Sequence, residues 1–338
     1  MTLSTLHSDE YKFEAPILYS IYFCSEKVGW IGGYQGIFYT NNGGGTWQRL
    51  PITVGSISRY REGTSDEQVG KILWADETRV IIRSHDGLLH ANALTNRWQD
   101  VPLSWQILTH IKDMTFAEEN RGWAIDWEGN IYATSDGGKT WKARAKKILS
   151  SPTKILAKSS RELWAIGANG MIGHTADGNE TWQVQKLHPD ANDILTSVQF
   201  INETQGWITS IDGSLFQTRD GGQNWSRLNL VTGKRIALEK VSFVNDSEGW
   251  IIGAISRKEV VGRDAGVIIH TNDGGIIFQI QLSSIDDYPI DVLGLKNGNA
   301  WVTGVRGKVL HTDNFGKSWV AVKLQTGREG KGKKREIR

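Results

Sequence analysis

The stretch TSDGGKTW, residues 134–141, places one carboxylate, three hydroxyls, a lysine and two glycines within eight residues. Such residues could cradle a phosphate, ligate a metal ion, or only close a turn. A phosphate cradle needs a helix N-terminus after the glycines, whereas a strand-like segment follows here. A calcium loop needs about six or more oxygen ligands, which a single carboxylate does not supply. We therefore predict a turn rather than a catalytic or metal-binding loop.

The same cluster recurs along the chain. Copies occupy residues 40–47, 134–141, 175–182, 218–225, 271–278 and 312–319, and a degenerate copy, ANALTNRW, occupies 91–98. Each copy ends in an aromatic residue, at intervals of 51, 43, 41, 43, 53 and 41 residues. These residues are Trp47, Trp98, Trp141, Trp182, Trp225, Phe278 and Trp319. Self-similarity with a period of about forty residues indicates a repeat architecture.

A second tryptophan recurs in the repeat at a nearly constant distance before the cluster's closing tryptophan. In five units this distance is 17 or 18 residues, and the second tryptophans are Trp30, Trp123, Trp164, Trp207 and Trp301. Trp250 lies 28 positions before Phe278, and we assign Trp74, which precedes Trp98 by 24, to the same place in its unit. Thirteen of the fifteen tryptophans are then explained, which leaves Trp105 and Trp127 outside the repeat.

Each unit predicts four short strands. Residues 194–230 read as ILTSVQFIN, GWITSI, GSLFQT and NWSRLNL, separated by turn residues. Four strands per forty-odd residues are typical of a β-propeller blade. We predict an all-β fold, a single seven-bladed β-propeller with four-stranded antiparallel blades over residues 17–324. A β-helix is the alternative, disfavoured because its repeat is usually shorter.

The ends of the chain are predicted to lie outside the ring. Residues 1–16 form an N-terminal segment that could close the ring, although blade seven has four strands of its own. Residues 325–338 are predicted to be a basic, disordered tail, because REGKGKKREIR from Arg328 carries six basic and two acidic residues.

Composition limits the kind of partner and the cellular location that we expect for this protein. The 338 residues carry a net charge of only +2, which does not favour nucleic acid as the partner. Cys24 is the only cysteine, so no intramolecular disulfide can form. The chain start lacks a basic segment followed by an apolar one, and no run of about 18 apolar residues occurs. We expect a cytoplasmic protein with no membrane span.

Residue types within the cluster suit a turn between the third and fourth strands. Asp136 and its counterparts can accept hydrogen bonds from the backbone amides that follow them. Gly138 and its counterparts permit a positive φ. The hydroxyl of Thr140 can close the loop, and the tryptophan covers it. The counterparts of Asp136 are Asn42, Asp177, Asp220, Asp273 and Asn314, those of Gly138 are Gly44, Gly222, Gly275 and Gly316, and those of Thr140 are Thr46 and Thr181.

Four histidines immediately precede copies of the cluster: His90, His174, His270 and His311. A metal ring is one interpretation. They would lie on different blades, however, and neighbouring sheets pack about 10 Å apart, which is too far to share one ion at bond lengths near 2 Å. We predict packing between blades or partial exposure instead.

The pattern S/T-x-D-x-G-x-T/S-W resembles the Asp-box, or BNR repeat, of sialidase-like propellers. The fuller unit, seen as MTFAEENRGWAIDWEGNIYATSDGGKTW, resembles the photosystem II stability/assembly factor family of cyanobacteria and plastids and its bacterial relatives. The resemblance covers almost the whole chain. It implies a non-enzymatic, chaperone-like scaffold that binds a newly made membrane-protein subunit through an arginine-rich surface. It implies no cofactor and no small-molecule substrate, and no binding residue can be transferred by alignment.

A sialidase-like or other glycan-binding or glycoside-processing propeller is the alternative. Sialidases carry an Arg-Ile-Pro type motif before the first Asp-box, whereas the RLP of residues 49–51 follows the first box. Seven units also differ from the six-bladed sialidase plan. No catalytic or metal-ligating constellation emerges elsewhere in the sequence.

Topology predicts where a protein partner binds. In a four-stranded antiparallel blade, the turns after the first and third strands lie on one face, so the Asp-boxes leave the opposite face to the blade connections. That opposite face collects two long irregular segments, 51–70 and 253–266, and many basic residues. The predicted partner-binding residues are Arg59, Arg61, Arg144, Lys146, Lys147, Lys234, Arg235, Arg257, Lys258, Arg263 and Arg306, with Lys154 nearby.

Overall fold

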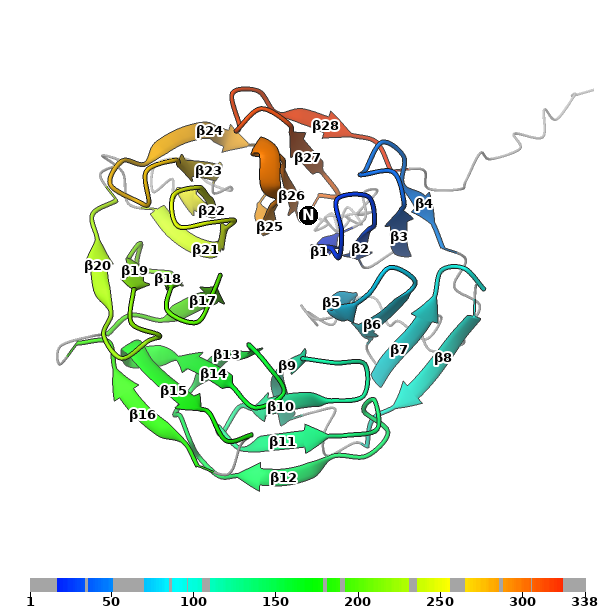
Figure 1. Ribbon diagram of the computed structural model, residues 1–338, viewed down its shortest axis with the longest axis vertical. Helices are drawn as coiled ribbons and strands as arrows, with labels where there is room; N and C mark the ends of the chain where they lie inside the picture. Colours follow the sequence, from blue (N-terminus) through cyan, green and yellow to red (C-terminus); the bar gives the residue numbers. More distant parts are fainter. Residues whose placement is uncertain are drawn as a thin grey trace, which may run out of the picture.

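The computed structural model describes residues 17–33, 36–50, 70–84, 87–95, 97–104, 110–178, 181–188, 192–230, 236–255, 265–285, 288–304 and 306–324. Within these residues, 28 strands form seven four-stranded antiparallel sheets. The sheets are arranged as blades around a ring (Figure 1). The predicted seven-bladed propeller is confirmed.

Four consecutive strands build each blade. Blades one to four contain β1 (Leu18–Phe23), β2 (Gly29–Gly33), β3 (Gly36–Thr40), β4 (Gln48–Arg49); β5 (Lys71–Ala75), β6 (Arg79–Arg83), β7 (Gly87–Asn92), β8 (Arg97–Pro102); β9 (Ile111–Phe116), β10 (Gly122–Asp126), β11 (Ile131–Thr134), β12 (Lys142–Ala145); and β13 (Pro152–Ala157), β14 (Leu163–Gly167), β15 (Met171–Thr175), β16 (Gln183–Lys186). Blades five to seven contain β17 (Leu195–Phe200), β18 (Gly206–Ser210), β19 (Leu215–Thr218), β20 (Ser226–Leu228); β21 (Ile236–Phe243), β22 (Gly249–Ile255), β23 (Ala265–Thr271), β24 (Gln279–Ile285); and β25 (Pro289–Gly294), β26 (Ala300–Gly304), β27 (Val309–Thr312), β28 (Val320–Val322). Two 3₁₀ turns interrupt this pattern: Ala168–Gly170 joins the second and third strands of blade four, and Lys296–Gly298 joins the first and second strands of blade seven.

The first strand of every blade lies at the centre of the ring and the fourth at its rim (Figure 1). The ring closes where blade seven packs against blade one, and each of these two blades is built from four consecutive strands. The backbone N of Ile21 donates to Oδ2 of Asp291 at 3.0 Å, and the ring of Trp301 stacks on Phe23 at 5.6 Å. Residues 1–16 and the tail 325–338 lie outside the described residues.

Tryptophans of the second strands form the contact between one blade and the next. Six of them are at most 1% exposed, and the ring of Trp207 stacks on Phe243 of the following blade at 3.8 Å. Large buried aromatic surfaces of this kind dominate core stability. These six residues are Trp30, Trp123, Trp164, Trp207, Trp250 and Trp301.

Blade two departs from this plan, and the assignment of Trp74 to the second strand is wrong. Trp74 lies on β5, the first strand, where it pairs with Ile81 of β6. Ile81 in turn lies opposite His90, as Trp164 lies opposite His174 in blade four. Ile81 also precedes Trp98 by 17 residues, the spacing of the other blades. An isoleucine therefore replaces the repeated tryptophan in blade two.

The turns divide between two faces as predicted. On one, called the box face, turns after third strands bond to turns after first strands, as from Gly137 N to Asn120 O at 3.0 Å. On the other, called the connection face, blade connections bond to turns after second strands, as from Ile148 N to Gly129 O at 3.0 Å.

Candidate functional site

Each Asp-box is a turn closed by its own side chains and amides. In blade three, the hydroxyl of Thr134 donates to Oδ1 of Asp136 at 2.8 Å and accepts from Gly138 N at 2.9 Å. Asp136 also accepts from the backbone N and the hydroxyl of Thr140, at 2.9 and 2.6 Å. Gly138 has φ 88°, which a side chain would disfavour. The predicted Asx-turn is confirmed, but the role of the leading threonine was missed, although six of seven copies carry it.

These contacts keep the box carboxylates ionised and engage their oxygens in hydrogen bonds within the turn. Burial acts to raise the pKa of Asp136, but the hydrogen bonds from Thr140 and Thr134 outweigh it and lower the pKa to about 2. Hydrogen bonds from Asn224 lower the pKa of Asp220 to about 2 as well. A carboxylate with such a pKa and with its oxygens bonded locally is a poor general acid or base near neutral pH.

Each of the four histidines lies on a third strand, directly opposite the second-strand residue that is a tryptophan in six blades and Ile81 in blade two. The ring of His174 stacks on Trp164 at 4.1 Å, and that of His311 stacks on Trp301 at 4.0 Å. His270 lies 5.0 Å from Trp250 and bonds to Glu248. In the part of the chain that the structure describes, no group of three or more His, Cys, Asp or Glu side chains could hold a metal ion. The histidines pack within and between blades.

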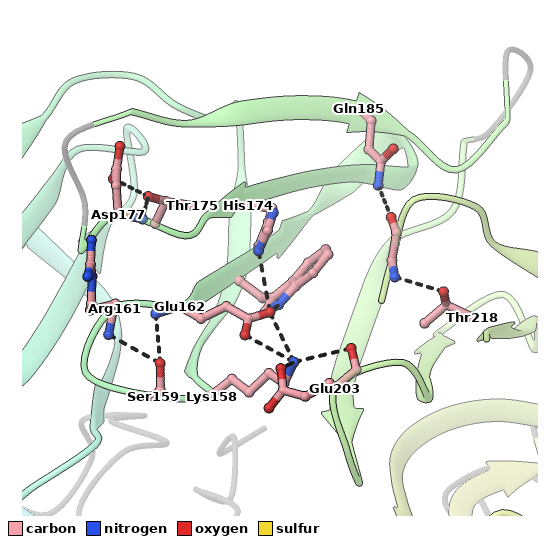
Figure 2. A network of polar contacts seen from close by, with 12 residues as sticks. Lys158, Ser159, Arg161, Glu162, His174, Thr175, Asp177, Gln185, Glu203 and Thr218 are labelled. Atoms are coloured by element: carbon pink, nitrogen blue, oxygen red, sulfur yellow. Dashed lines mark hydrogen bonds and ion pairs between the residues drawn. The ribbon is translucent and has the colours of Figure 1, made fainter. Parts of the chain in front are cut away.

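A polar network on the box face joins blades four and five (Figure 2). Lys158 Nζ donates to Glu162 at 3.1 Å and to Glu203 of the next blade at 2.8 Å. Burial acts to lower the pKa of Lys158, but the two carboxylates outweigh it and raise the pKa. Glu162 also accepts from Trp164 Nε1 at 3.2 Å and lies 3.4 Å from His174 Nε2. Lys158 is paired with both Glu162 and Glu203, which indicates a structural link between the two blades.

Charged side chains on the central strands were not anticipated from the sequence. Asp113 of β9 pairs with Lys71 of β5 and accepts from Ile155 N of β13 at 3.0 Å. Asp291 of β25 makes the same contacts with Lys240 and Ile21. Burial lowers the pKa of Lys71 to about 8 despite the opposing effect of Asp113. The available signal was a charged residue directly before a buried apolar one on the first strand.

The described basic residues of the connection face fall into two places. Arg144 lies on β12, Lys146 and Lys147 lie in the following connection, and Lys154 lies on β13; all four are exposed. Arg306 follows β26, across the ring from this group (Figure 1). The first four residues therefore lie along one stretch of chain from the rim strand β12 to the central strand β13, and the fifth lies in blade seven. The other predicted residues lie outside the described ranges: Arg59, Arg61, Lys234, Arg235, Arg257, Lys258 and Arg263.

Trp127, one of the two tryptophans outside the repeat, lies beside the first group. It begins the turn after β10 and is 57% exposed, with Lys112 Nζ 4.1 Å from its ring. Lys147 N donates to Asn130 Oδ1 in the same turn at 3.2 Å. The sequence signal was a tryptophan that serves no repeat position.

Two exposed isoleucines extend this surface to blade five. Ile194 and Ile211 are 44% and 43% exposed, and Ile211 N donates to Ile194 O at 3.0 Å. We call Trp127, Lys146, Lys147, Lys154, Ile194 and Ile211 the blade 3–5 surface. Exposed aromatic and aliphatic side chains interleaved with cations can bind a peptide, whereas they carry no nucleophile or acid–base pair.

Seven blades, six of which carry an Asp-box, define the class of this protein as a BNR-repeat propeller. Residues 90–191 and 183–257 match the family described as Photosynthesis system II assembly factor YCF48. The Photosystem II stability/assembly factor HCF136, chloroplastic, of Oryza sativa subsp. japonica is 31% identical over 123 residues, which are 36% of this chain and 28% of the rice protein. The chain is thus a photosystem II assembly factor-like BNR propeller.

Two solved structures share the fold. One, titled YCF48 bound to D1 peptide, is 18% identical and covers 88% of this chain and 91% of its own, with a TM-score of 0.67. The other, YCF48 from Cyanidioschyzon merolae, is 17% identical and covers 90% and 97%, also with a TM-score of 0.67. Among the described residues, no helix is long and apolar enough to span a membrane.

Proposed function

We propose that this chain is a non-enzymatic assembly factor that binds an extended segment of a protein partner on the blade 3–5 surface. One observation carries the proposal: the match to the assembly-factor family spans residues 90–257, which contain every residue of this surface. A structure with the same fold holds a D1 peptide, so a peptide ligand suits the architecture.

The chemistry of the surface supports an acidic or backbone-rich segment with an apolar side chain. Trp127 offers a large flat area, and exposed aromatic residues are over-represented among the few side chains that carry binding energy. Lys146 and Lys147 add two positive charges in one connection, which favour carboxylates on the partner. Lys154 adds a further positive charge to this surface, and Arg144 adds one on the same face outside it.

Fluorescence anisotropy with a labelled D1 peptide tests the proposal. Trp127→Ala is expected to weaken binding at least tenfold, and the double change Lys146→Glu with Lys147→Glu by a similar factor. The matched control reverses Lys139 and Lys317, two exposed lysines in Asp-box turns, and should leave affinity unchanged. Equal losses in the control, or none in the test variants, would contradict the proposed site.

The free energy of unfolding shows whether each variant is still folded. Trp127→Ala removes an exposed side chain and should change the free energy of unfolding by less than about 0.5 kcal/mol. Trp123→Ala, four residues earlier, empties a buried position and should cost about 3–5 kcal/mol. Loss of binding in stable Trp127→Ala then reports on the surface alone.

Several earlier predictions stay predictions within this proposal. Partner contacts by Arg306 and by the basic residues of the two long connections can be tested by charge reversal in the same assay. The absence of enzyme activity is supported by the occupied carboxylates of Asp113 and Asp291, each held by a lysine and a backbone amide. Hydrolysis of a fluorogenic sialoside or β-glucoside by the purified chain would favour the glycoside-processing alternative. A cytoplasmic location likewise stays a prediction.

A further inference from the structure

Blade two lacks the features that close the box face in the other blades. Ile81 stands where six blades have a tryptophan, and Ala91 stands where six boxes begin with threonine. The sequence ANALTNRW also lacks the box aspartate and glycine. Both losses fall at the same end of the same blade, beside blade three.

In complete blades the second-strand indole fills the space up to the next blade. A Cβ built at Gly222 would lie 2.1 Å from Cη2 of Trp164, and one built at Gly44 would lie 2.3 Å from Trp301. At Gly138 of blade three the nearest atom is Cδ1 of Leu88, a smaller side chain, at 2.3 Å. Leu88 therefore packs against Gly138 where an indole packs in the complete blades, and Ile81 is smaller than the tryptophan that it replaces.

A pocket of about 290 Å³ lies beside Ile81, between blades two and three at the box face. Trp74 and Ile81 give it apolar walls, while His90 and Arg97 bring polar groups to it. Arg79 and Glu119 also line it but are paired with each other, and Arg79 pairs with Asp76 at 2.6 Å as well.

One polar group of the pocket, Arg97, is exposed and makes no hydrogen bond or ion pair among the described residues, so its positive charge is free to pair with a ligand. Nε2 of His90 is buried without a hydrogen-bond partner, which is uncommon for a buried polar atom.

We propose that this pocket binds an aromatic side chain of a partner peptide, with a carboxylate beside it. The aromatic ring packs against the apolar wall that Trp74 and Ile81 form, next to the Arg79 guanidinium, which lies 5.5 Å from the Trp74 ring. The neighbouring carboxylate pairs with Arg97. This site lies on the box face, so it goes beyond the peptide site proposed on the connection face.

Titration of the full chain with acetyl-Asp-Trp-amide, followed by the indole N–H signal of Trp74 in NMR spectra, tests the proposal. We expect a saturable shift for the wild type and none for Ile81→Trp, which fills the pocket with the repeat residue. Arg97→Gln should weaken binding at least threefold. The neutral probe acetyl-Asn-Trp-amide should bind the wild type no more tightly than the acidic probe binds Arg97→Gln.

Two controls separate this site from other effects. Arg121→Gln removes the same charge from the box face outside the pocket and should bind like the wild type. The double reversal at Lys146 and Lys147 should also leave probe binding unchanged, because it alters only the connection face. No saturable shift in the wild type, an unchanged shift in a folded Ile81→Trp variant, or equal weakening by Arg97→Gln and Arg121→Gln would overturn the proposal. If Ile81→Trp fails to fold, the comparison of Arg97→Gln with Arg121→Gln decides alone.

Discussion

Asp113 and Ile155 are joined across two blades by a hydrogen bond of 3.0 Å from the backbone N of Ile155 to Oδ2 of Asp113. The other carboxylate oxygen pairs with Lys71, so one side chain of blade three holds blades two and four. Asp291 of blade seven holds blades six and one in the same way, through Lys240 and Ile21. The junction of blades seven and one, where the ring closes, is therefore held by the same aspartate contacts as the junction of blades three and four.

Removing the charge of either aspartate, Asp113 or Asp291, should destabilise the propeller. Asp113→Asn keeps the shape of the side chain but loses the charge that faces Lys71, and we expect a cost of about 2–4 kcal/mol in the free energy of unfolding. Asp291→Asn should cost a similar amount, and the two effects should add within about 0.5 kcal/mol because the sites share no partner. Urea denaturation measures both. Glu118→Gln, at an exposed turn, serves as the control and should shift stability by less than about 0.5 kcal/mol.

The lowered pKa of Lys71 predicts a rise in stability at alkaline pH. Below pH 8 the lysine is protonated in both folded and unfolded chains, so its burial cost is constant. Between about 8 and the ordinary value of 10.5, the unfolded chain binds the extra proton, and stability therefore increases with pH. With 27% of the side chain exposed, we expect a gain of about 2 kcal/mol.

Unfolding free energies at pH 7.5 and pH 10 measure this gain. The increase should be absent from Lys71→Met, whereas Lys142→Met, at an exposed position, should follow the wild type. A rise of the same size in Lys71→Met would assign the effect to other groups.

The fold could be predicted because its determinants repeat. An aspartate, a glycine and two tryptophans at a fixed spacing recur in most units, and each has a local or next-blade contact that every blade needs. Blade two was misread because Trp74 and the missing tryptophan belong to different strands, and residue type alone does not reveal pairing register. Only the observed pairing of Ile81 with His90 separates them.

The candidate site was less predictable. Topology alone placed the basic residues on the connection face, because strand order fixes which turns share a side. It did not reveal that Arg306 lies across the ring from Lys146. Trp127 stood outside the repeat in the sequence, but its exposure beside Lys112 emerges only when the turn after β10 is placed. Contacts such as Asp113 with Ile155 depend on neighbouring blades, which local patterns do not encode.

Thr134 provides a test of what holds an Asp-box. Thr134→Val keeps the shape but removes the hydroxyl that donates to Asp136 and accepts from Gly138 N, which is left buried without a partner. We expect a loss of about 1–3 kcal/mol in the free energy of unfolding. Thr134→Ser keeps the hydroxyl and should lose clearly less. Equal losses for the two variants, measured by urea denaturation, would assign the effect to the methyl group instead.

The box of blade six should be improved by a single substitution. Ile277 occupies the position of Thr140, and its backbone N donates to Oδ1 of Asp273 at 2.9 Å, but its side chain is 59% exposed and makes no bond to the carboxylate. Ile277→Thr supplies the hydroxyl that bonds Asp136 in blade three. We expect a gain of about 0.5–1 kcal/mol and less self-association, because an exposed apolar side chain is removed. Thermal denaturation and light scattering measure these effects, with Ile277→Val as the matched control without a hydroxyl. If Ile277→Val stabilised the chain as much as Ile277→Thr, the hydroxyl bond would not be the cause.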